Sequence, residues 1–509
     1  MSKISACEYK EAAEKWGCFE ITVQGRKEGN PFSDYTIQGT FVSKQETHTV
    51  NGFYDGDGSY KVRFMPSFED TYQFIVEGTF SEECFTGSFT AKTPGALNHG
   101  PVRVKDHVKL AYQDGTPYQS FGTTCYVWAL QNETLQKETL ETLKNTAFNK
   151  IRFCVFPKNY LFNFHEPVSY PYEGKPCDAS NITEDNFILF GEGAIPEDND
   201  WDFTRFNPQH FTHLEKCIQE LMELGIEADI ILLHPYDRWG FSKMGPENEN
   251  YYLKYVVSRF AAYRNVWWSI ANEYDLFFDK PLSDWEKNGE TVNRYDPYRH
   301  MCSIHNCFKF YDFNRSWITH CSIQRTELYR TAELTDEWLR TYNKPVVLDE
   351  ICYEGDICYA WGNISGEEMT RRFWQATLRG GHAGHGETYL GHDNILWWSH
   401  GAKLYGKSPE RIRFLAELMK EVPGGTLEFK EMEWDETVGV AGQGYSIHYY
   451  DQYRPSYRDF RLEEDKKYTV DVIDTWNMTM ERAGVHSGKF RILLPGREYM
   501  AIRIIEIRQ

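Results

Sequence analysis

Hydrophobic and polar residues follow different patterns in three parts of the chain. In the first part they alternate, within 19–23, 60–64 and 72–76. A period of two is typical of strands that bury one face, and the turn-rich segment 54–58 separates two of these runs. The pattern therefore predicts a small antiparallel β-sandwich over residues 1–93.

Short hydrophobic strands alternate with helical segments from about residue 118 onwards. Eight candidate strands lie at 118–128, 148–157, 226–237, 266–273, 300–307, 317–324, 344–355 and 385–398. Eight buried strands with intervening helices predict a (β/α)8 barrel, which we place at residues 94–424. A doubly wound sheet is the competing fold, but it needs a glycine-rich phosphate loop after its first strand, and Gly122 starts no such loop.

Two of the connecting helices carry signals for their ends. Asn207 before Pro208 predicts a helix start, because asparagine accepts from free N–H groups and proline suits the first turn. Gly225 predicts the end of the same helix. Ser365 with Glu368 has the spacing of a capping box and predicts a second start after strand seven.

Strand patterns return after the barrel. Alternation within 445–449, 468–472 and 500–504 predicts a second β-domain over residues 425–509. The fold class is therefore multidomain: a central (β/α)8 TIM barrel flanked by an N-terminal antiparallel β-sandwich and a small C-terminal β-domain.

Composition narrows the class of partner. A formal net charge of -20 argues against nucleic acid and anionic membranes, because both need a basic surface, and it favours a neutral substrate. Aromatic residues make up 16% of the chain, which suits stacking on sugar rings but also suits large β-domains. We expect a cytoplasmic protein, since the N-terminus lacks the pattern of a secretory signal and the 12 cysteines form no recognisable framework. The sequence contains no stretch of 18 apolar residues, so it predicts no membrane span.

Two predicted strands end on a glutamate. Glu273 follows Asn272 at the end of strand four, and Glu350 follows Asp349 at the end of strand seven. Catalytic groups of TIM barrels lie at the C-terminal ends of the strands, and strands four and seven lie nearly opposite each other. Two facing carboxylates are what glycoside hydrolysis requires, one as acid and one as nucleophile or base.

An Asn-Glu pair closing strand four and a second glutamate closing strand seven resemble glycoside hydrolase clan A, the family 5-like barrels. The resemblance implies a retaining mechanism with Glu273 as general acid/base and Glu350 as nucleophile. It implies further contacts from residues at other strand ends: Arg152 bracing the nucleophile, His234 contacting substrate, Asn272 bonding the sugar 2-hydroxyl, and Trp397 or Trp398 forming a stacking floor.

One position departs from the clan pattern. Clan members often have a strand-six tyrosine bonded to the nucleophile, but the segment 317–324 offers His320 and Gln324. His305 or Tyr353 could orient Glu350 instead. Other aromatic residues after strands one and three could line sugar subsites or belong to the core: Trp128, Tyr236, Trp239 and Phe241.

The flanking segments agree with this resemblance. The sequences around 29–41 and 53–66 resemble the β-sandwich that precedes the barrel in apiosidase-like clan A enzymes of gut bacteria, and 468–480 with 493–504 resembles their closing β-domain. The resemblance spans nearly the whole chain.

Histidines cluster in two places, but neither cluster has the spacing of a known metal motif. The clusters are His300, Cys302, His305 and Cys307 at strand five, and His382, His385, His392 and His400 near strand eight. Neither a metal nor another cofactor is therefore expected.

The sequence predicts a retaining exo-glycosidase of small neutral glycosides or plant-derived oligosaccharides. The long segment 158–207 could close a cleft into a pocket, or form a subunit contact in a homo-oligomer. The glycoside could be a β-xyloside, β-glucoside, β-galactoside, apioside or α-arabinoside. An endo-acting glycanase, a non-catalytic carbohydrate-binding barrel and a metal-dependent hydrolase are the alternatives.

Overall fold

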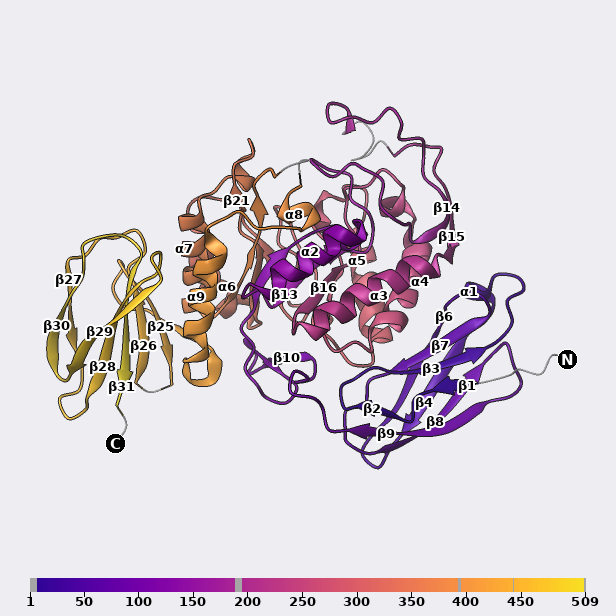
Figure 1. Ribbon diagram of the computed structural model, residues 1–509, viewed down its shortest axis with the longest axis horizontal. Coiled ribbons are helices and arrows are strands. Elements are labelled where there is room, and N and C mark those ends of the chain that lie inside the picture. The colour runs from indigo at the N-terminus through magenta and orange to yellow at the C-terminus, as the bar shows by residue number, and fades with distance from the viewer. Residues whose placement is uncertain (1–6, 188–194, 392–394, 443, 508–509) are drawn as a thin grey trace.

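A computed structural model describes residues 7–187, 195–391, 395–442 and 444–507. Figure 1 shows a central barrel with one β-rich part at each side, formed by the N-terminal and C-terminal segments. The predicted architecture is confirmed. Among the described helices, none has the length and apolar character needed to cross a bilayer.

The N-terminal part consists of two facing sheets. Their strand orders are β1-β3-β7-β6 and β2-β9-β8-β4-β5, and all pairs are antiparallel except β2 with β9. The strands are β1 (Cys7–Tyr9), β2 (Ala12–Glu14), β3 (Phe19–Gln24), β4 (Ile37–Val42), β5 (Thr47–Asn51), β6 (Phe53–Tyr54), β7 (Ser59–Phe64), β8 (Thr71–Gly78) and β9 (Phe85–Lys92), with the short helix α1 (Pro31–Asp34) between β3 and β4. Every second side chain of β3 is buried, as the alternation predicts.

Eight parallel strands form the barrel, in the order β18-β17-β16-β13-β12-β22-β20-β19. A parallel bridge between His305 and Ser322 joins the two outer members, so the sheet closes. In chain order the strands are β12 (Phe121–Thr124), β13 (Lys150–Cys154), β16 (Glu227–Ile231), β17 (Val266–Ser269), β18 (Cys302–Ser303), β19 (Cys321–Gln324), β20 (Val346–Glu350) and β22 (His382–His385).

The eighth strand lies earlier than the sequence predicted. It is His382–His385, whereas the end of the predicted segment 385–398 belongs to the short helix α8 (Trp397–His400). Strand β22 fits beside its neighbours because Gly384 has no side chain. A Cβ at this position would lie 2.4 Å from the Asp349 carbonyl oxygen. Hydrophobic periodicity alone cannot separate a short buried strand from a short buried helix, which explains the error.

Helices surround the barrel. They are α2 (Glu133–Lys144), α3 (Pro208–Glu223), α4 (Pro246–Phe260), α5 (Leu282–Tyr295), α6 (Thr335–Tyr342), α7 (Gly366–Leu378) and α9 (Ser408–Lys420). Short 3-10 turns lie at η1 (Trp128–Leu130), η3 (Phe241–Lys243), η4 (Tyr274–Leu276), η5 (Ala332–Leu334), η6 (Ala360–Gly362) and η8 (Pro423–Gly425). Asn207 and Ser365 cap α3 and α7 as predicted, each accepting from a main-chain N–H.

Three small antiparallel or parallel pairs complete the barrel domain. The hairpin of β10 (Val102–Lys105) and β11 (Lys109–Tyr112) buries Val102 and Leu110 against Trp267 and Val347 of the barrel interior. The long connection after β13 contains β14 (Tyr172–Lys175) paired with β15 (Asp200–Phe206). The connections after strands seven and eight contain β21 (Glu354–Gly355) and β23 (Glu387–Thr388), which pair in parallel.

The C-terminal part has one six-stranded sheet, β24-β25-β26-β31-β28-β29, and one two-stranded sheet, β27-β30. Its strands are β24 (Glu428–Lys430), β25 (Thr437–Ala441), β26 (Tyr445–Tyr449), β27 (Tyr457–Arg461), β28 (Tyr468–Asp474), β29 (Thr479–His486), β30 (Lys489–Leu493) and β31 (Met500–Glu506). It packs on α7, where the rings of Trp374 and Tyr449 stack with centroids 5.4 Å apart.

A buried ionic network joins the N-terminal sandwich to the barrel. Arg63 of β7 donates to Glu215 of α3 at 2.5 Å, and Arg259 of α4 donates to the same carboxylate and forms an ion pair with Asp55 at 2.7 Å. Buried ions need close partners because the protein interior solvates them poorly. The network therefore fixes the sandwich against α3 and α4, on the side away from the C-terminal part (Figure 1).

Candidate active site

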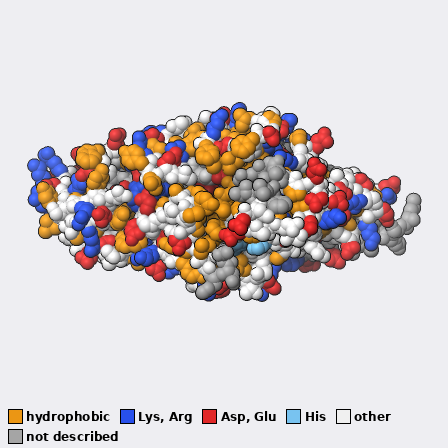
Figure 2. Space-filling model, turned by 90° about the horizontal axis from the view of Figure 1, so that it is seen from above, with side chains coloured by type: hydrophobic (Ala, Val, Ile, Leu, Met, Phe, Trp, Pro, Cys, Tyr) orange, Lys and Arg blue, Asp and Glu red, His pale blue; other side chains and the backbone are white. Residues whose placement is uncertain are grey.

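A cavity of about 430 Å³ lies at the C-terminal end of the barrel, where the connections after the strands meet. Its polar wall includes Glu273 and Glu350, and its aromatic wall is formed by Tyr126, Tyr160, Tyr236, Tyr353, Trp361 and Trp398. The connections that follow strands two and eight rise on the upper side of Figure 1, and Figure 2 shows hydrophobic side chains gathered near the middle of that face. Aromatic walls beside carboxylates suit the apolar faces and the hydroxyl groups of a sugar.

Glu273 lies just beyond the end of β17 and is buried. Its backbone has a φ of 49°, in the left-handed region that non-glycine residues rarely adopt, so this turn aims the carboxylate at a conformational cost. Gln324 donates to Oε1 at 3.1 Å, while Asn272 at 3.2 Å and the Tyr236 hydroxyl donate to Oε2. Burial and the neighbouring charge of Glu350 raise the pKa of Glu273 above its ordinary value, despite these donors.

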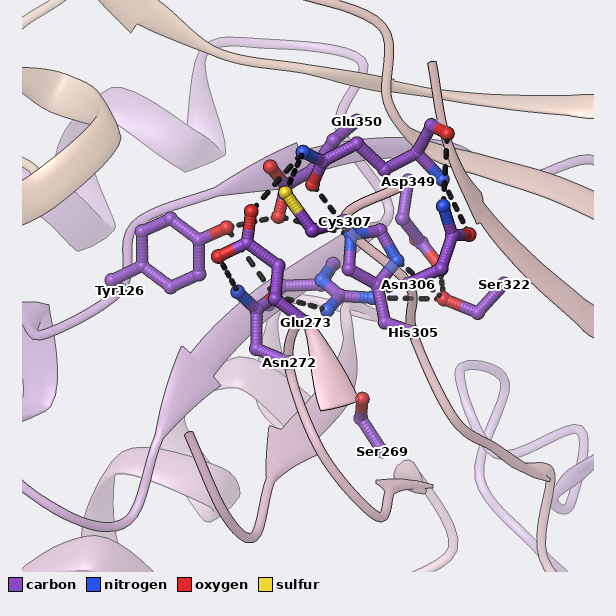
Figure 3. Close-up of polar contacts among 12 residues, drawn as sticks. Tyr126, Ser269, Asn272, Glu273, His305, Asn306, Cys307, Ser322, Asp349 and Glu350 are labelled. Carbon is purple, nitrogen blue, oxygen red and sulfur yellow. Dashed lines mark hydrogen bonds and ion pairs between the residues drawn. The ribbon is translucent and has the colours of Figure 1, made fainter. Parts of the chain in front are cut away.

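Glu350 is the last residue of β20 and faces the same cavity (Figure 3). The Tyr126 hydroxyl donates to Oε1, and His305 Nε2 lies 3.2 Å from the same oxygen. Burial acts to raise the pKa of Glu350, but His305, Arg152 and the Tyr126 hydroxyl outweigh it and hold this pKa below the ordinary glutamate range. The two pKa values are thus shifted in opposite directions, which favours the protonated form of Glu273 and the ionised form of Glu350.

A second set of charged side chains supports the strand that carries Glu350 from inside the barrel. Asp349 accepts from Lys150 at 2.7 Å and from Ser322 at 2.5 Å, and it forms an ion pair with Arg152 at 2.9 Å. All four side chains are buried. Because Ser322 Oγ also lies 3.0 Å from His305 Nδ1, the network positions the imidazole that contacts Glu350.

The structure brings most of the predicted site residues together. Asn272 Oδ1 accepts from Arg152 at 3.0 Å, so the arginine holds the amide whose other end reaches Glu273. Tyr353 and Trp398 line the cavity. His305 was one of two residues suggested as partners of Glu350 in the absence of a strand-six tyrosine, and its Nε2 lies 3.2 Å from a Glu350 oxygen.

Six of the eight predicted substrate-binding residues lie outside the cavity lining. Three of them, Arg152, Asn272 and His305, belong to the contacts around Glu273 and Glu350 described above, and the other three are Trp128, Trp397 and His234. Trp128 is fully buried against Phe153, and Trp397 donates through Nε1 to Thr123 at 2.8 Å. His234 points Nε2 at the Phe156 carbonyl at 3.2 Å, and burial lowers its pKa to about 3. The aromatic candidates divide in the same way, since Tyr236 lines the cavity whereas Trp239 and Phe241 pack in the core.

Sequence reasoning missed several residues of the cavity, among them Tyr126, Lys158, Tyr160 and Trp361. Lys158 Nζ lies 3.6 Å from the ring centroid of Tyr126 and 4.3 Å from that of Tyr236, and burial lowers its pKa. Tyr126 and Lys158 follow β12 and β13 by two and four positions. Their signal was a polar or aromatic residue just past a barrel strand. The predicted strand 118–128 had included Tyr126, whereas Lys158 directly follows the predicted strand 148–157.

The two predicted histidine clusters do not form compact ligand groups within the described residues. His300 bonds the Ala261 carbonyl at 2.8 Å and His382 accepts from Ser120 at 3.1 Å, while His392 lies outside the described residues. One mixed group does assemble there, from Glu354, His385 and Glu387.

A comparison with protein families identifies the class of this fold and site. A family profile described as "Apiosidase-like, catalytic domain" matches residues 105–455, more than half of the chain. The chain belongs to the apiosidase-like family. It is a glycoside hydrolase. Two domains of unknown function match the flanks of this apiosidase-like chain, DUF5060 at 12–79 and DUF5605 at 434–505.

Solved structures agree with this assignment. A provisionally assigned glycoside hydrolase from Bacteroides vulgatus ATCC 8482 is 35% identical, with 98% of this chain and 100% of that chain covered and a TM-score of 0.90. A glycoside hydrolase family 5 structure from the same strain is 14% identical, with 82% and 95% covered and a TM-score of 0.61, and shares the fold. A comparison with curated proteins finds no match.

Proposed function

We propose that this apiosidase-like protein is a retaining exo-glycosidase in which Glu350 is the nucleophile and Glu273 the general acid/base. The observation that carries the proposal is the pair of buried carboxylates in one cavity with pKa shifts of opposite direction. A group with a raised pKa can hold the proton that a leaving oxygen needs, while a group with a lowered pKa stays ionised and nucleophilic.

The reaction proceeds in two displacements. Glu350 attacks the anomeric carbon while Glu273 transfers its proton to the glycosidic oxygen, which leaves with the aglycone. Glu350 Oε1 holds its contacts with Tyr126 and His305, which leaves Oε2 as the attacking atom. The ester that forms removes the charge of Glu350, so the pKa of Glu273 falls and this residue can deprotonate the incoming water.

A small neutral glycoside is the proposed substrate. The cavity volume of about 430 Å³ lies in the lower part of the roughly 300–1,000 Å³ range of ligand pockets, which favours a short substrate. Lys158 and Tyr160, at the start of the long connection 158–207, line this cavity and support the idea that the connection narrows a cleft. The family name favours an apioside among the candidate sugars. We place the reaction in the cytoplasm, and cell fractionation of the native host tests that location.

A panel of aryl glycosides tests the proposal. Wild-type protein should hydrolyse one or a few of them, and Glu350→Ala should lose about four or more orders of magnitude in kcat, as removal of a nucleophile does. Azide should partly restore turnover of Glu350→Ala and yield a glycosyl azide of inverted configuration. Glu410→Ala, at an exposed glutamate of α9, is the matched control and should keep full activity. Full activity of Glu350→Ala on a substrate of the wild type would refute the assignment.

The role of Glu273 has its own test. In Glu273→Ala, substrates with good leaving groups should lose much less activity than substrates with poor ones, because only the latter need the proton. An equal loss across leaving groups would contradict the acid role. Hydrolysis of a polymer faster than any aryl glycoside would replace exo by endo action.

A further inference from the structure

A second group of buried acids lies outside the catalytic cavity. Glu354 of β21 and Glu387 of β23 are direct neighbours in the parallel pair that joins these two strands, and both are at most 1% exposed. His385, the last residue of β22, is fully buried beside them. One ring nitrogen of His385 and one carboxylate oxygen of each glutamate all lie within 4.8 Å of one another.

The histidine has an atom without a partner. His385 Nδ1 lies 3.2 Å from the Thr123 hydroxyl oxygen, whereas Nε2 has no hydrogen-bond partner in the described residues. The ring stacks on Phe148, with centroids 4.8 Å apart, and burial lowers its pKa to about 3, so the imidazole is neutral. A neutral imidazole whose second nitrogen bonds a fixed neighbour is the form in which histidine binds a metal.

Neither glutamate has a cationic side-chain partner in the described residues. Glu387 accepts from the main-chain N–H groups of Tyr405 and Gly406, and Glu354 accepts from those of Lys407 and Ser408 at 2.7 and 3.0 Å. Burial and the adjacent Glu354 raise the pKa of Glu387 to about 8. Two buried carboxylates of like charge need a proton or a cation between them.

The backbone is shaped to enclose both carboxylates. A Cβ on Gly406 would lie 2.6 Å from a carboxylate oxygen of Glu354 and 2.6 Å from one of Glu387. Glycine therefore lets the connection between α8 and α9 approach both acids at once. Glu354 Oε2 and both Glu387 oxygens each accept one main-chain bond and keep a second lone pair for another partner, whereas Glu354 Oε1 also accepts from the Tyr389 hydroxyl at 3.4 Å.

We propose that Glu354, Glu387 and His385 bind one divalent first-row transition-metal ion, with Zn²⁺ as the representative. One imidazole nitrogen and two carboxylate oxygens are a three-residue donor set that this class of ion accepts, with Thr123 as the group that orients the imidazole. Contraction of the group from its 4.8 Å span would bring the donors to coordination distance.

The ion would join three segments that shape the sugar cavity. Glu354 directly follows Tyr353, and Gly406 lies in the connection that also carries Trp398; both aromatic residues line the cavity. The carboxylates of the site are distinct from Glu273 and Glu350, so the ion takes no part in bond cleavage. Its effect is to hold the aromatic wall in place.

Metal binding is measured with chelator-treated full-length protein carrying Cys84→Ser and Cys358→Ser, because these two cysteines are exposed and could bind Zn²⁺ themselves. Isothermal titration with ZnCl₂ should give one equivalent bound, and Zn²⁺ should raise Tm in a saturable way. Glu387→Gln and His385→Gln should each weaken Zn²⁺ binding by about 100-fold or more.

The matched control is His382→Gln. His382 lies on the same strand, is buried and has an unpartnered Nε2, but among the described residues it belongs to no group of three candidate metal ligands. This variant should keep Zn²⁺ binding. The proposal is overturned if the protein with Glu354, His385 and Glu387 intact takes up no Zn²⁺. It is also overturned if Glu387→Gln and Glu354→Gln bind Zn²⁺ as tightly as the Cys84→Ser, Cys358→Ser protein. A shared proton between the two glutamates would then be the remaining explanation. The wild-type titration decides even if one variant fails to fold, and loss of glycosidase activity plays no part in it.

Discussion

Replacing Tyr126 with phenylalanine removes one hydrogen bond from Glu350 and keeps the aromatic ring in place. The hydroxyl donates to the same Glu350 oxygen that His305 approaches at 3.2 Å, so one of two contacts with this oxygen remains. Since this donor helps to keep the pKa of Glu350 low, its loss should raise that pKa.

The size of the effect follows from the strength of such bonds. A hydrogen bond to a charged group contributes about 1.5–3 kcal/mol, which corresponds to a rise of about 1–2 pH units in the acidic limb of kcat/KM. The sign is fixed by the mechanism, because the free enzyme is active only above the pKa of its nucleophile. On the acidic limb Tyr126→Phe should therefore lose about 10- to 100-fold in kcat/KM, and near the optimum it should lose less.

The assay is the pH dependence of kcat/KM on the best aryl glycoside. Tyr236→Phe is the matched control, because Tyr236 donates to Glu273 and lowers the pKa of that group. It should move the basic limb upwards and leave the acidic limb in place. An acidic limb of Tyr126→Phe that coincides with that of the wild type would refute the assigned contact between Tyr126 and the nucleophile.

Three further predictions concern charge. In Glu350→Gln the pKa of Glu273 should fall, because a neighbouring negative charge is removed, and NMR titration of carboxyl-labelled protein can follow it; an unchanged value would show that the two groups are not coupled. Asp349→Asn should destabilise the protein by about 3–5 kcal/mol in urea unfolding, since it leaves two buried cations short of a partner, and a loss below about 1 kcal/mol would contradict that role. Glu215→Gln should cost a similar amount. Arg63 and Arg259 hold the pKa of Glu215 below its ordinary value in the folded protein. The stabilisation from Glu215 is therefore complete above the pKa of this group in the unfolded chain, and it is lost as the pH falls through its pKa in the folded protein. The variant should accordingly unfold with a weaker dependence on acid than the wild type.

The sequence predicted those features that repeat or that lie at fixed places in a repeat. Eight hydrophobic runs are enough to indicate a barrel, and the ends of runs four and seven point to Glu273 and Glu350, which both line the cavity. Helix ends at Asn207 and Ser365 were predictable for a local reason, because a side chain caps main-chain groups within a few residues of itself.

Features that depend on contacts between distant segments were not predictable in this way. The eighth strand was misplaced because the close approach of Gly384 to Asp349 leaves no periodic signal. Tyr126 and Lys158 were missed because their roles follow from contacts with Glu350 and Tyr236, which lie on other connections of the barrel. Trp128 and Trp397 look equally suited to a sugar site in the sequence, yet their rings pack elsewhere, and only the path of the connections decides between these outcomes.

The central claim is that Glu350 forms a covalent bond to the sugar with Glu273 as its acid/base. A slow fluorosugar analogue of whichever aryl glycoside the protein hydrolyses should trap this ester, and intact-mass and peptide mass spectrometry should place one sugar on Glu350. The account predicts this label in the wild type and in Tyr126→Phe, and its absence in Glu350→Ala. A sugar attached to any other residue, or hydrolysis that directly inverts the anomeric configuration without a trapped ester, would contradict it.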